Sequence, residues 1–276
     1  MRIRTVILDF DGTCTDVEQE AQGFLAGYKA DLARLVGSED IEATWRAAEA
    51  QVRAEPSRFG MVIGGRLVAP AVDAYLLATS ISSVIQPDLG DAEIERLFLE
   101  NYRFTTTAFK PETRTLLDAL AAADVEVCVV TNSDAAKVAA KLDVLKPAKR
   151  EAIRLHGNAR KFLVEEPAEH RDAAAFARVP STIRVAGWPR PIYARRGSYF
   201  DALCSIWEST NTTPGETLVV GDVFELDLVL PGTLGCRVHL VSGPRTLDYE
   251  RRGVTAMDGS WDTDLLAVMR LLESAS

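Results

Sequence analysis

Two aspartates near the amino terminus carry the strongest chemical signal in the sequence. Asp9 and Asp11 stand in the segment DFDGT, directly after a short apolar run at residues 6–8. Side chains two residues apart on an extended chain point to the same side, so these carboxylates repel each other unless a cation or hydrogen bonds compensate. A hard metal ion such as Mg²⁺, which prefers oxygen ligands, is the expected partner. The same residue types also begin turns and cap helices, which is the structural alternative.

Polar residues also follow two later apolar runs. Thr131 comes after the run at 125–130, and Asp222 and Asp227 come after the run at 217–220. If these runs are parallel strands, their carboxyl ends meet at the edge of the sheet where ligands bind. The sequence therefore predicts one acidic, metal-binding edge that also presents a hydroxyl group.

The elements that would position these residues alternate between strand and helix. Continuous apolar runs that end in polar turns are typical of parallel strands covered on both faces. They lie at residues 6–8, 125–130, 217–220 and 237–241, with helical patterns at 113–121 and 198–208. This order predicts an α/β fold, a doubly wound (Rossmann-like) parallel sheet.

Two insertions interrupt this core, which we assign to residues 1–16 and 109–276. Residues 17–108 have helical periodicity and predict an inserted helical domain, in which the glycine-rich stretch 59–70 is expected to be an irregular loop. Residues 144–193 predict a second, β-rich insertion. There, alternating residues on both sides of Gly157 and Asn158 suggest a hairpin.

Three motifs in order make the chain resemble the haloacid dehalogenase-like superfamily. They are LDFDGTCTD at the first strand, VVTNS around Thr131, and VVGDVFELD, which ends at Asp227. The resemblance covers the core but not the insertions. It implies that residues 17–108 form a cap domain and that Mg²⁺ is the cofactor.

The resemblance also implies roles for individual residues. Asp9 would attack phosphorus, and Asp11 would serve as general acid and base. The phosphoryl oxygens would rest on Thr131, Asn132 and backbone N–H groups near Gly12. The metal ligands would be Asp9, Asp11 (through its backbone carbonyl), Asp222 and Asp227.

The chain departs from the family pattern at the third motif, which is usually a lysine at or near a helix start. No lysine lies between Lys161 and the fourth motif, so we expect an arginine to take its place. Arg196, just before the helix predicted at 198–208, is the first choice, with Arg195 and Arg190 behind it. An arginine offers a bidentate fork to phosphoryl oxygens, although a solvated surface role is the alternative for each.

These motifs predict a phosphatase that hydrolyses a small phosphorylated metabolite. A phosphomutase acting on a sugar phosphate shares the first chemical step, and a catalytically retired binding protein could share the fold. Family members that break carbon–halogen bonds lack the second aspartate, so Asp11 argues against dehalogenation.

Composition limits the other classes of function. The 276 residues carry a formal net charge of −9, which argues against a broad surface for nucleic acid. No stretch approaches the roughly 20 apolar residues of a membrane span, and the first apolar run is too short for a signal peptide. The four cysteines are far apart in the sequence and show no metal or redox spacing. We therefore expect reduced thiols and a cytoplasmic protein. No sequence pattern indicates the oligomeric state.

Overall fold

The structure, a computed structural model, describes residues 2–169 and 172–274 and divides the chain into two compact units. Unit 1 comprises Met1–Thr15 and Phe109–Ser276, and unit 2 comprises Asp16–Ala108. Within the described residues, no helix is long and apolar enough to cross a membrane. All four cysteines are free and buried.

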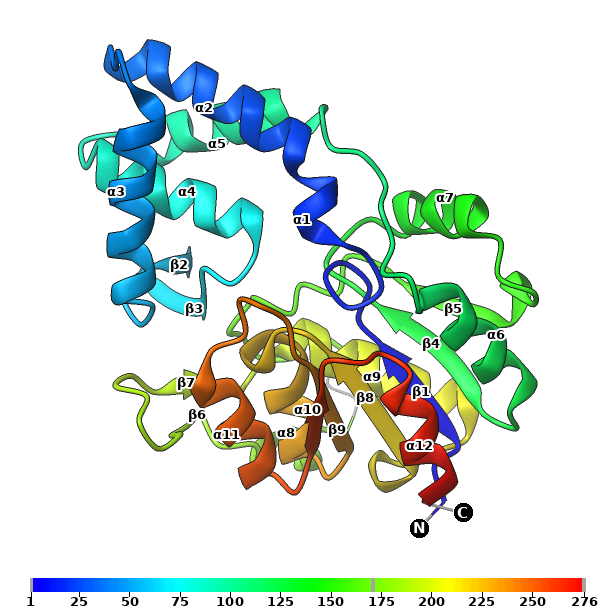
Figure 1. Cartoon of the computed structure of the whole chain (residues 1–276). Helices are drawn as coiled ribbons and strands as arrows, with labels where there is room; N and C mark the ends of the chain where they lie inside the picture. Colours follow the sequence, from blue (N-terminus) through cyan, green and yellow to red (C-terminus); the bar gives the residue numbers. More distant parts are fainter. Residues whose placement is uncertain (1, 170–171, 275–276) are drawn as a thin grey trace. The chain divides into compact units, whose positions relative to one another are not determined.

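Unit 1 is built on a six-stranded sheet with the strand order β10-β9-β8-β1-β4-β5, in which every neighbouring pair is parallel (Figure 1). The strands are β1 (Thr5–Leu8), β4 (Glu126–Val130), β5 (Ile153–His156), β8 (Thr217–Gly221), β9 (Arg237–Val241) and β10 (Ser260–Asp262). The four predicted strands are thus confirmed as β1, β4, β8 and β9. The doubly wound α/β core is confirmed with them.

Helices cover both faces of this sheet. The α-helices are α6 (Thr113–Ala122), α7 (Ala135–Leu145), α8 (Ala173–Arg178), α9 (Gly197–Thr210), α10 (Val229–Thr233), α11 (Asp248–Ala256) and α12 (Ala267–Ser274). Short 3₁₀ turns occupy Arg150–Ala152 and Pro214–Glu216, and a π-helical turn, η3, occupies Phe224–Leu228. The predicted helices at 113–121 and 198–208 are confirmed as α6 and α9.

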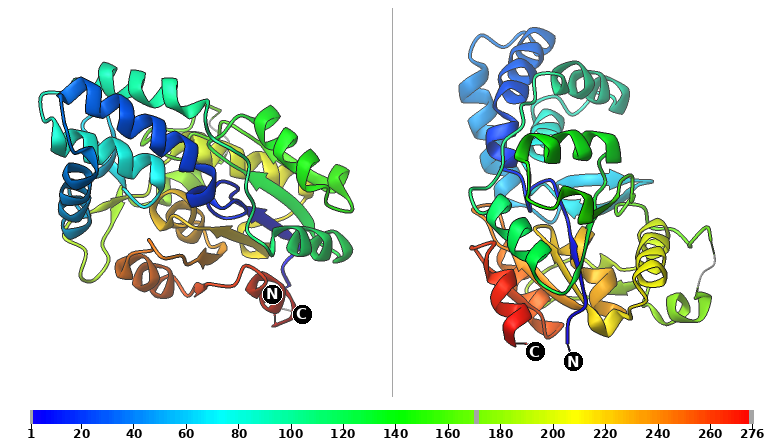
Figure 2. Two further views of the ribbon diagram at one scale, coloured as in Figure 1. Left: turned by 45° about the horizontal axis from the view of Figure 1, so that its top comes forward. Right: turned by 90° about the vertical axis from the view of Figure 1, so that its right-hand side faces the viewer.

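Alternation along the strands divides the core into two layers. Val6 and Leu8 of β1 pack with α6, α7 and α12 on one face, whereas Ile7 packs with α8 to α11 on the other. In the right-hand view of Figure 2, α6 and α12 lie on one side of the strands and α9 on the other. Because both faces are covered, the strands read in the sequence as continuous apolar runs.

Unit 2 is mainly helical, as the periodicity of residues 17–108 predicts. Its helices are α1 (Val17–Glu20), α2 (Gln22–Val36), α3 (Ile41–Ala54), α4 (Ala74–Ile85) and α5 (Asp91–Tyr102), around an aromatic and aliphatic core. The stretch 59–70 was expected to be an irregular loop, and this is wrong. It forms an antiparallel hairpin of β2 (Gly60–Ile63) and β3 (Arg66–Pro70). Gly64 and Gly65, both at positive φ, form the two-residue turn.

The expected hairpin around Gly157 and Asn158 is also wrong. Residues 153–156 form β5, which lies parallel to β4 at the edge of the main sheet, so this stretch belongs to the core. In an edge strand covered mainly on one side, apolar and polar residues alternate as they do in a hairpin strand. This shared pattern is why a hairpin was predicted here.

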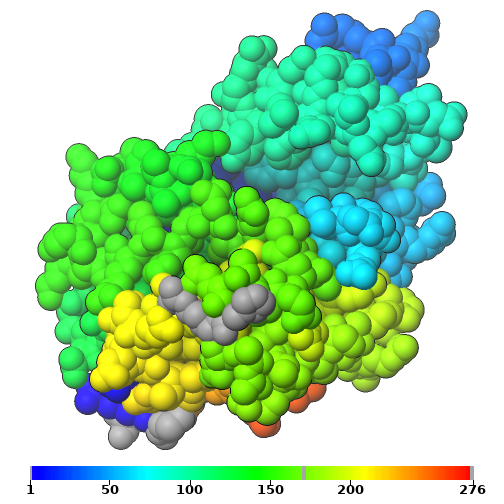
Figure 3. All heavy atoms as spheres, turned by 180° about the vertical axis from the view of Figure 1, so that it is seen from behind, coloured from blue at the N-terminus to red at the C-terminus, as the bar shows by residue number. Residues whose placement is uncertain are grey.

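The segment that follows β5 contains α8 and a small antiparallel pair, β6 (Thr182–Ile183) and β7 (Ile192–Tyr193). Figure 3 shows this segment, in lime green, at the surface beside the yellow α9. It separates β5 from α9 along the chain.

Candidate functional site

Three carboxylates meet at the carboxyl edge of the main sheet. Asp9 follows β1, and its backbone N–H donates to Val220 O at 2.8 Å, which continues the pairing with β8. Oxygen atoms of Asp9, Asp222 and Asp227 lie within 4.8 Å of one another. The predicted meeting of these strand ends is therefore present in the structure.

The cation in contact with Asp9 is a lysine. Lys161 Nζ lies 2.7 Å from Asp9 Oδ1 and 2.9 Å from Asp227 Oδ1, and its side chain is 1% exposed. We expected an arginine here, with Arg196 first. The structure instead places a lysine at this point, shortly after β5 and well before α9.

Lys161 is held in place by two neighbouring elements, the end of β4 and the start of α9. Its backbone N–H donates to Asn132 Oδ1 at 2.7 Å, and Ala159 N–H donates to Thr131 O at 2.9 Å, so the chain after β5 is tied to the end of β4. The fully buried Arg196 donates from Nη1 to Lys161 O at 2.7 Å. Asn132 and Arg196 thus position the lysine through its backbone.

The other two candidate arginines have partners away from this cluster. Arg195 donates to Glu166 Oε2 at 2.8 Å, and its guanidinium lies over the ring of Phe176. Arg190 forms a 2.7 Å ion pair with the fully buried Glu225.

Burial and charge act together on this cluster. Burial by itself would lower the pKa of Lys161, but the carboxylates of Asp227 and Asp9 outweigh it and raise the pKa. The pKa of Asp9 is raised as well, because burial and the carboxylates of Asp227 and Asp222 outweigh the nearby ammonium. The cluster therefore carries more negative than positive charge, which is unfavourable in a buried site.

This donor set fits a divalent cation. Three carboxylates and one ammonium leave two negative charges, which such an ion cancels, and carboxylate oxygens are the ligands that Mg²⁺ prefers. Asp9 and Asp222 would hold it, together with Asp227, whose Oδ2 also accepts from Val223 N–H at 2.9 Å. The structure thus brings together three of the four predicted metal ligands, Asp9, Asp222 and Asp227, and the backbone carbonyl of Asp11 stays a prediction.

A tight backbone approach shapes the metal side of the cluster. Gly12 has φ +92°, and a Cβ added there would lie 2.3 Å from Asp222 Oδ2. Thr13 Oγ1 donates to Asp222 Oδ1 at 2.9 Å. The Gly12 N–H donates to Thr15 Oγ1 at 3.1 Å, so this N–H already has a partner within the loop.

Asp11 lies in a separate, more open environment. Its Oδ2 accepts from Ser133 Oγ at 2.6 Å and from Thr131 Oγ1 at 3.3 Å. Its Oδ1 lies 2.9 Å from Lys141 Nζ, and its side chain is 31% exposed. A carboxylate held on hydroxyl groups and accessible to solvent can exchange protons with a ligand.

Sequence reasoning missed Ser133, Lys141 and Lys161 as neighbours of the aspartates. Ser133 stands in the quoted motif VVTNS. Recognition of 153–156 as a fifth strand of the same parallel sheet would have placed Lys161 at the same edge as Asp9. Lys141 lies on α7, and no motif marks it.

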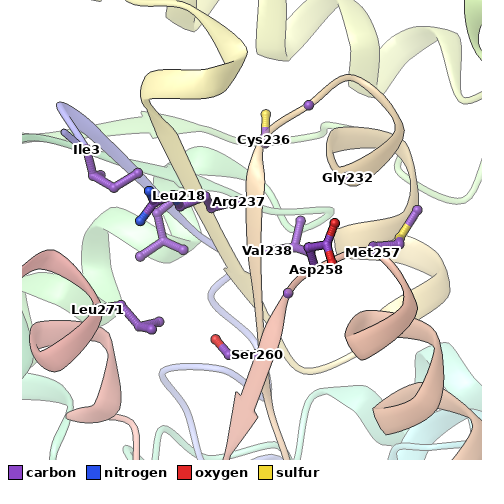
Figure 4. A pocket seen from close by; sticks show the side chains of 12 residues that line it. Ile3, Leu218, Gly232, Cys236, Arg237, Val238, Met257, Asp258, Ser260 and Leu271 are labelled. Atoms are coloured by element: carbon purple, nitrogen blue, oxygen red, sulfur yellow. The ribbon is translucent and has the colours of Figure 1, made fainter. Parts of the chain in front are cut away.

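A cavity of about 590 Å³ lies elsewhere in unit 1. Figure 4 shows residues at the amino ends of the strands around it, including Leu218, Arg237 and Ser260. The carboxyl ends of the same strands carry the acidic cluster. The large cavity and the reactive groups are therefore at opposite edges of the sheet.

Fold and site together define a doubly wound α/β protein with an acidic centre that can hold a metal. Residues 3–228 match the family model of the haloacid dehalogenase-like hydrolases. The chain therefore belongs to this hydrolase family. The curated proteins contain no match to it.

Similar solved structures extend over almost the whole chain. A predicted phosphoglycolate phosphatase from Haemophilus somnus 129pt is 15% identical, with a TM-score of 0.54 and coverage of 98% of both chains. YfnB from Bacillus subtilis, solved bound to magnesium, is 12% identical, with a TM-score of 0.52 and coverage of 99% of both chains. A haloacid dehalogenase-like family hydrolase from Streptococcus pneumoniae is 11% identical, with a TM-score of 0.54 and coverage of 98% of both chains. At these identities the likeness establishes the fold alone.

Proposed function

We propose that this hydrolase is a Mg²⁺-dependent phosphatase that cleaves a small phosphate monoester through an aspartyl-phosphate on Asp9. The observation that carries the proposal is the pairing of two different aspartates at one sheet edge. Asp9 is buried against Lys161, whereas Asp11 is half-buried and rests on hydroxyl groups. The first environment suits a nucleophile, and the second suits a residue that moves protons.

In the first half of the reaction, a carboxylate oxygen of Asp9 attacks phosphorus and the bond from phosphorus to the leaving oxygen breaks. Asp11 gives its proton to that oxygen, so the product leaves as an alcohol and not as an alkoxide. Lys161 offsets negative charge next to the nucleophile. The Thr131 hydroxyl exchanges its 3.3 Å contact with Asp11 Oδ2 for a hydrogen bond to a phosphoryl oxygen. Magnesium, when bound by the carboxylates, supplies the positive charge that lets a phosphate dianion approach them.

In the second half, Asp11 accepts a proton from water, and that water attacks the phosphorus of the aspartyl-phosphate. The bond to the Asp9 oxygen breaks, which releases inorganic phosphate and restores the carboxylate. Ser133 Oγ, at 2.6 Å from Asp11 Oδ2, keeps the acid–base residue oriented through both steps.

Asp11 also separates hydrolysis of phosphate esters from dehalogenation. A halide leaves without a proton, whereas an alcohol needs one, so a positioned acid is of use only with an oxygen leaving group. We assign unit 2 the role of a cap that selects the substrate, as expected for a helical domain inserted between the first two motifs.

The experiment is hydrolysis of 4-nitrophenyl phosphate by the purified protein. Activity is expected with Mg²⁺, is expected to disappear with EDTA, and is expected to be lost in Asp9→Asn, which changes the charge but hardly the shape. Activity that persists in Asp9→Asn would remove Asp9 as the nucleophile. With a sugar phosphate as substrate, release of inorganic phosphate supports the phosphatase, whereas an isomeric sugar phosphate would indicate a phosphomutase.

A further inference from the structure

Lys141 is a cation at the site to which the reaction above gives no role. Its Nζ lies 2.9 Å from Asp11 Oδ1, and its side chain is 18% exposed. Lys161, by contrast, is 1% exposed between Asp9 and Asp227. Of these two ammonium groups, Lys141 is therefore the one that a substrate can reach.

The helix that carries Lys141 fixes its position. Val138 and Leu142 anchor α7 in the hydrophobic core of unit 1, and Asp134 caps its first turn by accepting from two backbone N–H groups. The ammonium also lies 5.8 Å from the centroid of the buried Phe10 ring, which is within the range of a cation–π contact. A side chain held in this way can discriminate between ligands, because little freedom is lost when a ligand binds.

We propose that Lys141 selects phosphate esters whose leaving alcohol carries a carboxylate close to the ester oxygen. The inference rests on the proposed function, in which Asp11 protonates that oxygen. A hydrogen bond of about 2.8 Å from either Asp11 oxygen places the leaving oxygen within roughly 6–8 Å of Lys141 Nζ. A carboxylate on the carbon next to the ester can bridge this interval.

The charges of the site explain why such a group needs a dedicated cation. Four aspartates face this edge of the sheet, and their field disfavours a second anion on the substrate. A single ammonium at the leaving-group position matches the single charge of a carboxylate. A neutral leaving group gains nothing comparable from Lys141.

Two isosteric esters provide the test: the monophosphates of glycolic acid and of glycolamide, which differ in charge but hardly in shape. With Mg²⁺, wild type is expected to have a higher kcat/KM for the acid than for the amide. Lys141→Met should reduce this preference by about 10- to 100-fold, the effect of losing one charge-assisted hydrogen bond. Lys141→Arg should keep most of the preference, and Lys137→Met, exposed on the same helix, should keep all of it.

An unchanged preference in Lys141→Met, or a wild type that favours the amide, would overturn the proposal. Failure of the proposed function would look different, because 4-nitrophenyl phosphate would then show no hydrolysis that depends on Asp9. In that case calorimetric binding of the two esters in the presence of Mg²⁺ still decides the matter. Tighter binding of the acid that is lost in Lys141→Met supports Lys141 as the selecting residue, and equal loss for both esters contradicts it.

Discussion

Removal of the buried ammonium by Lys161→Met should destabilise the fold and slow catalysis. Methionine approximates the length of the lysine stem, so the main change is the loss of a positive charge between Asp9 and Asp227. Both carboxylates are largely buried, and each loses a contact shorter than 3 Å. Breaking a buried ion pair by removing one partner costs about 3–5 kcal/mol. For a domain of this size, that lowers the melting temperature by about 6–20 °C.

The divalent ion provides a diagnostic signature for this prediction. Without Lys161 the cluster carries one more negative charge, so Mg²⁺ should stabilise the variant more than it stabilises wild type. Thermal unfolding of both proteins, in EDTA and then in excess Mg²⁺, measures this directly. Hydrolysis of 4-nitrophenyl phosphate should fall by about a hundred- to a thousandfold, as when a preorganised hydrogen-bond donor is removed from an active site.

The matched control is Lys137→Met, which removes an exposed ammonium from α7. It should change stability by less than about 0.5 kcal/mol, as surface substitutions usually do. Two results together would refute the assignment of Lys161 as counter-charge to the carboxylates. They are a melting temperature of Lys161→Met equal to that of wild type in EDTA, and an equal increase in both melting temperatures on addition of Mg²⁺.

Two further experiments test the backbone and the buried charges around the site. Gly12→Ala places a Cβ 2.3 Å from Asp222 Oδ2, so it should raise the Mg²⁺ concentration that gives half-maximal activity by about 5- to 150-fold, which corresponds to the roughly 1–3 kcal/mol of a strained contact. Gly235→Ala, at φ +94° with open space around it, should leave the Mg²⁺ titration unchanged; equal effects of the two variants would exclude the contact with Asp222 as the cause. Burial raises the pKa of Glu250 from 4.5 to about 8, so its contribution to stability is complete below about pH 4.5 and is lost as the pH rises through about 8. This loss amounts to roughly 3–5 kcal/mol, and urea unfolding across this range should show wild type losing stability relative to Glu250→Gln as the pH rises; a difference independent of pH would contradict the buried carboxyl as its source.

Physical patterning explains which parts of the fold could be predicted. β1 and β4 are covered on both faces, so their sequences are continuous apolar runs that periodicity detects. β5 lies at the sheet edge and alternates, and β10 has only three residues. Local sequence therefore carried too little information to place either of them.

The same difference between the strands explains why only part of the site could be predicted. Asp9, Thr131 and Asp222 follow strands that could be recognised, so their meeting at one edge could be inferred from topology alone. Lys161 follows the strand that was misassigned, and a long segment separates it from α9. The rule that placed the cation at a helix start therefore pointed to Arg196. That arginine is buried and supports Lys161 through its backbone carbonyl.

The most direct test of the proposed phosphatase mechanism is chemical identification of the intermediate on Asp9. Asp11→Asn should slow the water step, while 4-nitrophenol, a good leaving group, hardly needs protonation, so the aspartyl-phosphate should accumulate with this ester and Mg²⁺. Acid quenching, followed by borohydride reduction of the acyl phosphate, converts the modified aspartate to homoserine, which tandem mass spectrometry locates. Homoserine is expected at position 9, and only when substrate is present. Turnover with no modification at position 9, or with modification of a different aspartate, would contradict it.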